Sequence, residues 1–140
     1  MSFDQIFKKE TFDIPKKGTI NCHAGKLPLY RGRNILNWAL INGESEFGIT
    51  VHFIDEGIDT GDIIAQLRVS FFDDDTLKTT YARLRKLSVS LFLAIWDEVK
   101  LGKMLGIKQD KSNGSHYFKK DFDGILGGLK NGWDTKISDL

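Results

Sequence analysis

The chain has one cysteine, Cys22, and no apolar run that approaches the length of a membrane-spanning helix. A single cysteine excludes a disulfide framework within the chain and a metal site built from several thiolates. About 20 consecutive apolar residues are needed to span a bilayer, so we expect no membrane-embedded helix. The first ten residues, MSFDQIFKKE, also lack the apolar core of a secretory signal. These absences favour a reducing compartment, and the cytoplasm is the expected location.

A strong excess of charge of one sign is lacking as well. The 140 residues include 20 basic and 19 acidic side chains, which gives a formal net charge of +1. Because proteins that bind nucleic acid tend to carry a strongly basic surface, we expect no nucleic-acid partner. Apolar residues make up 41% of the chain, which is ordinary for one globular domain with a modest core.

Apolar periodicity predicts a domain of the α/β class. We expect three strands, at about 18–23, 47–54 and 62–69, and two helices, at about 34–42 and 76–102. The connection between the second and third strands is short, which favours antiparallel pairing. Asn34 is a good residue to cap the first helix, and the acidic run before Thr76 suits the positive start of the second.

Two short motifs carry side chains suited to catalysis. Asn21 and His23 flank Cys22 at the end of the first expected strand. Because side chains alternate along a strand, Asn21 and His23 should share one face and Cys22 should lie on the other. The carboxyl end of a strand is where open α/β sheets place chemistry. Asp59 lies in a Gly-rich loop, DEGIDTG at 55–61, between the second and third strands.

Together these motifs resemble the folate-dependent formyltransferases, which formylate an amine with 10-formyltetrahydrofolate. The resemblance covers about residues 1–100 and rests on four motifs in the family's order: Asn-x-His at 21–23, Leu-Pro at 27–28, Gly-x-Thr-x-His at 48–52 and Asp-Thr-Gly at 59–61. It implies a Rossmann-like formyl transferase domain, with a mixed sheet flanked by helices. It also implies that the catalytic triad is Asn21, His23 and Asp59.

These three side chains have the chemistry that acyl transfer needs. Asn21 would donate its amide N–H to the oxyanion, and His23 would accept the amine proton or, when protonated, help to hold the oxyanion. Asp59 would orient His23 and raise its basicity, or receive a proton through water. Cys22 should face away, so we expect no thiol nucleophile. The resemblance implies 10-formyltetrahydrofolate as the formyl donor and no metal.

The loop that follows Leu27-Pro28 points to one subfamily. Its Tyr-Arg-Gly-Arg-Asn sequence at 30–34 resembles the sugar-nucleotide N-formyltransferases, which act on amino sugars for surface polysaccharides such as lipopolysaccharide O-antigen. The resemblance therefore implies a dTDP- or UDP-linked amino sugar as acceptor. The residues expected to bind donor or acceptor are Tyr30, Arg31, Gly32, Arg33, Asp55, Gly57, Thr60 and Gly61. Glycinamide ribonucleotide and methionyl-tRNA are the alternative acceptors, although the loop at 29–34 argues against both. The bland composition after residue 105 also fits neither a tRNA-binding domain nor a basic arm.

Several of these residues also have simpler interpretations. Arg31 and Arg33 either anchor a phosphate or the loop, or belong to a solvated loop. Tyr30 packs in the core or stacks on a ligand, and packing is the more common role. His52 is expected to be a structural histidine, in the core or at the surface.

One departure from the family bears on activity. In the family, the Asn-x-His strand follows the first half of the Rossmann-like sheet, whereas only twenty residues precede Asn21 here. We therefore expect residues 1–104 to be the carboxyl-terminal portion of a catalytic domain, and 105–140 to be a short extension. The alternative from a different class is an inactive fragment that forms homo-oligomers through an open sheet edge.

Overall fold

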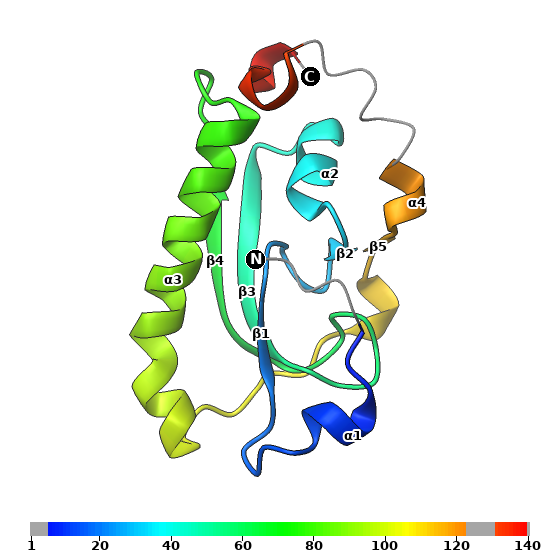
Figure 1. Cartoon of the computed structure of the whole chain (residues 1–140), viewed down its shortest axis with the longest axis vertical. Helices are drawn as coiled ribbons and strands as arrows, with labels where there is room; N and C mark the ends of the chain where they lie inside the picture. The colour runs from blue at the N-terminus through cyan, green and yellow to red at the C-terminus, as the bar shows by residue number, and fades with distance from the viewer. Residues whose placement is uncertain (1–5, 123–130, 140) are drawn as a thin grey trace.

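The computed structural model describes residues 6–122 and 131–139. Its elements are α1 (Lys9–Phe12), β1 (Ile20–His23), β2 (Arg31–Gly32), α2 (Ile35–Ile41), β3 (Glu46–Phe53), β4 (Ile63–Ser70), α3 (Leu77–Leu101), β5 (His116–Tyr117) and α4 (Lys119–Phe122), with short 3-10 turns at Lys111–Asn113, Gly132–Asp134 and Ile137–Asp139. The expected α/β class, with sheets flanked by helices, is confirmed (Figure 1). Within the described ranges, no helix is both long and apolar enough to cross a membrane.

The main sheet has the order β1-β3-β4, with β3 in the centre. Both of its pairings are antiparallel, so the expected pairing of the second and third strands is confirmed. All six residues from Phe47 to His52 are buried, because both faces of β3 are covered. Phe47 and Ile49 pack with Leu84 of α3 in the core on one face. Thr50 and His52 therefore project from the opposite face, toward the loop that follows β1.

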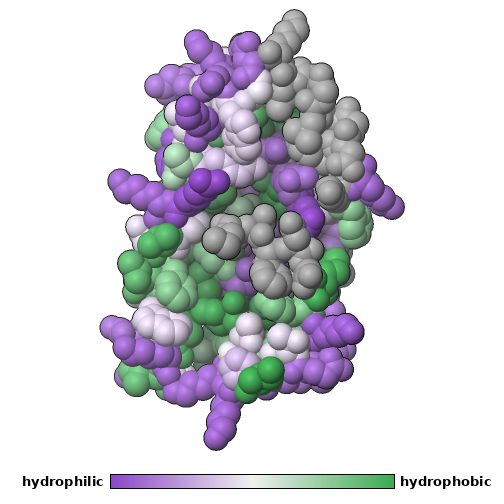
Figure 2. Space-filling model, in the orientation of Figure 1, coloured by the Kyte–Doolittle hydropathy of each residue, from purple (hydrophilic) through white to green (hydrophobic). Residues whose placement is uncertain are grey.

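Helix α3 runs along one side of the sheet (Figure 1). It begins after Thr76, whose side chain accepts a hydrogen bond from the Thr79 N–H in a capping box. It ends at Gly102, which has the left-handed conformation (φ 72°) common at helix ends. The expected helix at 76–102 is thus confirmed. Val89 and Leu93 of this helix remain exposed, and hydrophobic surface is seen on the α3 side of the molecule in Figure 2.

Helix α2 begins where expected but for a different reason. Asn34 occupies the capping position, yet its side chain makes no capping hydrogen bond. Its backbone is left-handed (φ 57°), because the preceding loop turns sharply into the helix. The end of α2 matches the expectation more closely, since Gly43 is left-handed (φ 70°) and its N–H donates to the Leu40 carbonyl.

The segment after α3 returns to the loop that precedes α2. Ile107 forms an antiparallel bridge with Ile63 at the start of β4. Farther along, β5 pairs in parallel with β2, and the two short strands lie side by side in Figure 1. Residues 107–117 therefore lie against the start of β4 and the loops that follow β1 and β3.

Candidate active site

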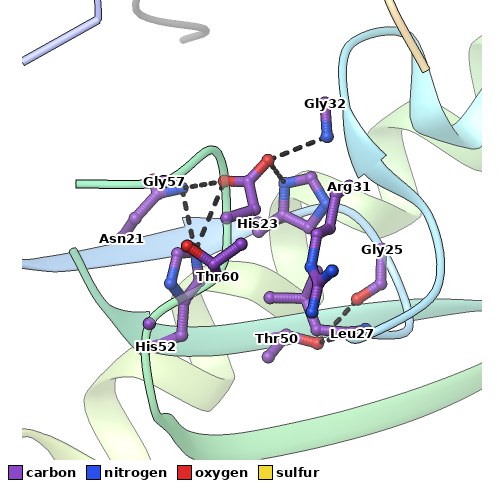
Figure 3. A network of polar contacts seen from close by, with 12 residues as sticks. Asn21, His23, Gly25, Leu27, Arg31, Gly32, Thr50, His52, Gly57 and Thr60 are labelled. Atoms are coloured by element: carbon purple, nitrogen blue, oxygen red, sulfur yellow. Dashed lines mark hydrogen bonds and ion pairs between the residues drawn. The ribbon is translucent and has the colours of Figure 1, made fainter. Parts of the chain in front are cut away.

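Three neighbouring elements bring polar side chains to one point (Figure 3). Asn21 and His23 come from β1, and His52 comes from β3, where it lies directly opposite Asn21 in the sheet register. Asp59 comes from the loop between β3 and β4. As expected from strand alternation, the Cys22 thiol lies on the other face, where it contacts Ser88 of α3. The structure therefore brings together the three residues of the expected triad and adds His52.

Asp59 lies at the centre of this cluster. Its Oδ2 accepts a hydrogen bond of 2.9 Å from the Gly32 N–H and lies 3.5 Å from His23 Nδ1. Its Oδ1 lies 3.5 Å from His52 Nε2 and 3.5 Å from Asn21 Nδ2. The backbone of Asp59 is left-handed (φ 53°), a conformation that aspartate tolerates better than most residues. This turn directs the carboxylate inward to all four partners.

The hydrogen bonds of the two histidines fix their neutral tautomers. His23 Nε2 lies 2.7 Å from the Tyr30 carbonyl oxygen, which can only accept, so Nε2 carries the hydrogen. In the same way, His52 Nδ1 donates to the Phe53 carbonyl over 2.7 Å. Neutral His23 then has a free lone pair on Nδ1 beside Asp59, and His52 Nε2 lies 3.5 Å from the Asp59 carboxylate. His52 Nε2 also lies 3.4 Å from Asn21 Nδ2, which can donate to it. His23 Nδ1 is thus arranged to accept a proton.

Burial sets the charge state of the pair formed by His23 and Asp59. Burial lowers the pKa of His23 below its usual 6.5, and the Asp59 carboxylate offsets this only in part. Burial alone would raise the pKa of Asp59. The hydrogen bond with His52, the charge of protonated His23 and the Gly32 N–H outweigh that effect and lower the pKa of Asp59 to about 2. At neutral pH the arrangement is therefore an ionised carboxylate beside a neutral imidazole, which is the state that a general base requires.

The loop after β1 supports His23 from the other side. Tyr30 has a left-handed backbone (φ 60°), unusual for a bulky residue, and this conformation turns its carbonyl toward His23. The Tyr30 hydroxyl donates to Glu44 over 2.7 Å, and its ring stacks on Tyr117 at 5.3 Å. Burial is the main cause that raises the pKa of Tyr30 to about 12. Its side chain thus packs, and its backbone carbonyl is the group that contacts the site.

The basic residues of this loop differ in their surroundings. Arg31 is only 1% exposed, and its guanidinium donates to the Gln109 side-chain oxygen from Nε and Nη2. A solvated loop is therefore wrong for Arg31. Gly32 is left-handed (φ 102°), and a Cβ there would lie 2.0 Å from the Tyr117 carbonyl oxygen. Arg33 is half-buried, and its N–H donates to the same carbonyl.

The polar groups of the Gly-rich loop at 55–61 form hydrogen bonds with one another. Asp55 Oδ1 accepts from the Gly57 N–H over 3.1 Å and from the Thr60 hydroxyl over 2.5 Å. A Cβ at Gly61 would lie 1.9 Å from the Phe53 carbonyl oxygen, so only glycine fits there. Asp55, Gly57 and Thr60 also line an open hollow of about 600 Å³ beside α1, to which Asn21 and His23 do not contribute. These loop residues hold the turn that presents Asp59.

Four residues contribute to this site in ways that were not anticipated from the sequence. His52 and Thr50 alternate within Gly-x-Thr-x-His, a pattern that places them on one face and that can locate them near the site. Thr50 donates to the Gly25 carbonyl over 2.6 Å and so holds the loop after β1. A Cβ at Gly25 would lie 2.6 Å from His23 Nε2, so glycine is needed beside the imidazole. No sequence signal points to Gln109, which contacts Arg31 and the Asp59 loop from far along the chain.

Solved structures with this fold include formyltransferases in complex with folates and nucleotide sugars. The formyltransferase PseJ of Anoxybacillus kamchatkensis, in complex with UDP-4,6-dideoxy-4-formamido-L-AltNAc and tetrahydrofolate, is 38% identical, with a TM-score of 0.89 over 97% of this chain and 71% of its own. The N-formyltransferase of Helicobacter canadensis, in complex with folinic acid and dTDP-3-aminofucose, is 31% identical, with a TM-score of 0.77 over 86% of this chain and 44% of its own.

Curated relatives in sequence have a different acceptor in their names. The methionyl-tRNA formyltransferase of Geobacter sulfurreducens is 41% identical over 112 residues, which are 80% of this chain and 35% of that protein. The chain thus spans about a third of the length of the curated relatives that it matches first. The formyl transferase family model matches residues 1–95. The chain belongs to the formyl transferase family.

Proposed function

We propose that this chain carries the catalytic residues of an enzyme that transfers a formyl group from 10-formyltetrahydrofolate to the amine of a nucleotide-linked amino sugar. A dTDP- or UDP-linked sugar used for surface polysaccharide, such as lipopolysaccharide O-antigen, is the proposed acceptor class. One observation carries the proposal: Asp59 lies within 3.5 Å of His23 Nδ1, and its pKa is about 2. A base and an ionised partner are thus side by side in a chain of the formyl transferase family.

The chain's own groups account for each proton in such a transfer. A bond forms between the amine nitrogen and the formyl carbon, and the bond from that carbon to folate N10 breaks. Asn21 Nδ2 donates a hydrogen bond to the formyl oxygen as it gains negative charge, a contribution typically worth about 3 kcal/mol. His23 Nδ1, with its lone pair free, takes the proton that the amine loses. Asp59 stabilises the imidazolium that results, and His23 returns this proton to N10 as the bond from N10 to the formyl carbon breaks.

The sugar acceptor is supported by solved structures that resemble this chain. PseJ matches nearly the whole chain, and its structure holds a UDP-linked 4-formamido sugar. The Helicobacter canadensis enzyme was solved with dTDP-3-aminofucose. The Tyr-Arg-Gly-Arg loop at 30–33 points the same way. A UDP-linked 4-amino sugar is therefore the first acceptor to test.

Methionyl-tRNA is the second candidate acceptor, and a specific observation favours it. The curated relatives that match at 37–41% identity over about 110 residues are methionyl-tRNA formyltransferases. The net charge of +1 argues against it, because binding to the tRNA backbone favours a basic surface. The two acceptors therefore belong in one assay.

The chain spans only part of its relatives, so we propose that residues 1–104 are one portion of a larger catalytic domain and that the rest of the domain supports donor binding. The assay follows tetrahydrofolate release from 10-formyltetrahydrofolate with a UDP-linked 4-amino sugar, dTDP-3-aminofucose or methionyl-tRNA. The chain is tested alone and as a fusion behind the part of PseJ that it does not cover. Turnover with a sugar supports the proposal. Turnover with methionyl-tRNA alone favours the second candidate, and no turnover in either form contradicts both.

A further inference from the structure

Gln109 is a buried polar residue beyond the range that the family model matches. It is 8% exposed and lies between the bridge at Ile107 and the 3-10 turn that begins at Lys111. Its side-chain nitrogen donates to two backbone carbonyls of the catalytic loop, that of Asp59 over 3.0 Å and that of Gly61 over 2.6 Å. Its side-chain oxygen accepts two hydrogen bonds from Arg31, of 3.2 and 2.7 Å.

The partners of Gln109 leave its side-chain amide only one orientation. A guanidinium can only donate, so it must face the amide oxygen, and backbone carbonyls can only accept, so they must face the NH₂ group. Both amide hydrogens and both oxygen lone pairs are then used. A carboxylate of the same shape would keep the bonds from Arg31 but would have nothing to donate to Asp59 and Gly61. Glutamine is thus specifically suited to this position.

The carboxylate and the backbone carbonyl of Asp59 are held by two adjacent residues, Gly32 and Arg31. Its carboxylate accepts from the Gly32 N–H directly, and its carbonyl is held by Arg31 through Gln109. The left-handed backbone of Asp59 (φ 53°) is unfavourable for a residue with a Cβ, so it persists only where its surroundings hold it. The bonds from Gln109 to Asp59 and Gly61 lie on either side of Thr60 and so restrain this turn at two points.

We propose that Gln109 is a positioning residue for Asp59: it holds the left-handed turn that keeps the carboxylate between His23 and His52. The inference rests on the proposed function for its catalytic consequence. The segment around Gln109 is thereby assigned to the active site, although it lies about fifty residues after Asp59 in the chain.

Three variants of the 140-residue chain separate this role from general stability. Gln109→Glu can still accept both hydrogen bonds from Arg31 but loses the two bonds that Gln109 donates to Asp59 and Gly61, so the chain should still fold. Gln109→Leu also leaves the buried Arg31 without its acceptor and measures the cost to folding. Lys108→Gln, at an exposed neighbouring position, is the matched control.

NMR chemical shifts report the position of Asp59 even if the chain alone has no activity. In Gln109→Glu we expect the Gly32 amide proton to move upfield, because it loses the carboxylate, and the Asp59 Cα and Cβ shifts to leave their left-handed values. In Lys108→Gln both signals should stay at their wild-type positions. Unchanged Gly32 and Asp59 signals in a folded Gln109→Glu chain would overturn the proposal, and so would equal changes in the control.

Kinetic measurements then test whether Gln109 affects catalysis, with the chain alone or the fusion, whichever is active. A displacement of about 1 Å in a catalytic group can cost roughly 100-fold in rate, so Gln109→Glu should lower kcat by about that factor. The KM for the acceptor should change by less than about threefold, because the hydrogen bonds of Gln109 are with Arg31 and with the backbone of Asp59 and Gly61. An unchanged kcat alongside displaced Asp59 signals would contradict the proposed role of Asp59. Failure of the proposed function and failure of the positioning role are thus read in separate measurements.

Discussion

His23 and Asp59 face each other with 3.5 Å between Nδ1 and Oδ2, and the other nitrogen of the ring is committed to the Tyr30 carbonyl. This relationship leaves one nitrogen of His23 to exchange protons and places a carboxylate beside it. Burial favours the neutral ring, whereas Asp59 favours the charged one, and burial has the larger effect on the pKa of His23. The pair is therefore ready to accept a proton at neutral pH.

The pH dependence of catalysis should follow His23. The pKa of His23 lies below 6.5, so kcat/KM should stay level at neutral pH and fall only as pH drops below 6.5, where the base becomes protonated. Asp59→Asn removes the charge that raises this pKa and should move the acidic limb to lower pH, with a lower plateau. A pH–rate profile of the wild type and this variant is the measurement. A limb centred above 6.5, or one that Asp59→Asn moves upward, would contradict the assignment.

The free energy of unfolding at acid pH should also depend on Asp59 and His23. The pKa of Asp59 is about 2 in the folded chain against 3.8 when unperturbed, so its contribution is present above pH 3.8 and is lost as pH falls toward 2. A shift of just under two units corresponds to about 2 kcal/mol. His23 acts in the same direction from pH 6.5 downward, because burial keeps it neutral. Urea unfolding from pH 7 to pH 2 should show smaller losses in Asp59→Asn and in His23→Gln. If either variant lost as much unfolding free energy between pH 7 and pH 2 as the wild type, the substituted residue would not contribute to the acid sensitivity.

His52 should influence Asp59 more than a structural histidine would. Its ring lies 3.5 Å from Asp59 Oδ1 and helps to lower the pKa of that carboxyl. We expect the pKa of Asp59 to rise from about 2 toward 3.8 in His52→Leu, as followed by the carboxyl carbon in an NMR titration. His116→Gln changes an exposed histidine of β5 and is the control. Equal titration of Asp59 in the wild type and in His52→Leu would show that His52 only packs.

Gly25 should not tolerate even one methyl group. A Cβ there would lie 2.5 Å from the Tyr30 carbonyl oxygen and 2.6 Å from His23 Nε2, so alanine must break the bond that orients His23. Gly25→Ala should destabilise the fold by about 1–3 kcal/mol, as overpacking does, and should also lower activity. Gly43→Ala has open space but a left-handed backbone and should cost only about 1 kcal/mol, with activity unchanged. Denaturation and rate measurements on both variants separate the two effects. Full activity in Gly25→Ala would show that catalysis does not require a glycine beside the His23 ring.

Local patterns predicted most of the framework, and the motifs predicted three of the four clustered residues, namely Asn21, His23 and Asp59. The α3 helix could be predicted because its stripe, its start at Thr76 and its end at Gly102 are local signals. Alternation along β1 was enough to place Asn21 and His23 on one face. The left-handed turns at Tyr30 and Asn34 could not be predicted, because contacts with residues far along the chain, such as Ser115, hold that loop. Gln109 was missed for the same reason, since its role exists only through contacts with Arg31 and the Asp59 loop.

The central claim is that His23, oriented by Asp59, serves as the base for formyl transfer to a nucleotide-linked amino sugar. The most direct measurement is the rate of tetrahydrofolate release with 10-formyltetrahydrofolate and a UDP-linked 4-amino sugar, for the wild type and for His23→Ala in the same active form. Loss of a positioned general base typically costs 100- to 10,000-fold, so we expect a decrease of roughly 1,000-fold in kcat in a variant that still folds. A folded His23→Ala variant that releases tetrahydrofolate at the wild-type rate would contradict the account.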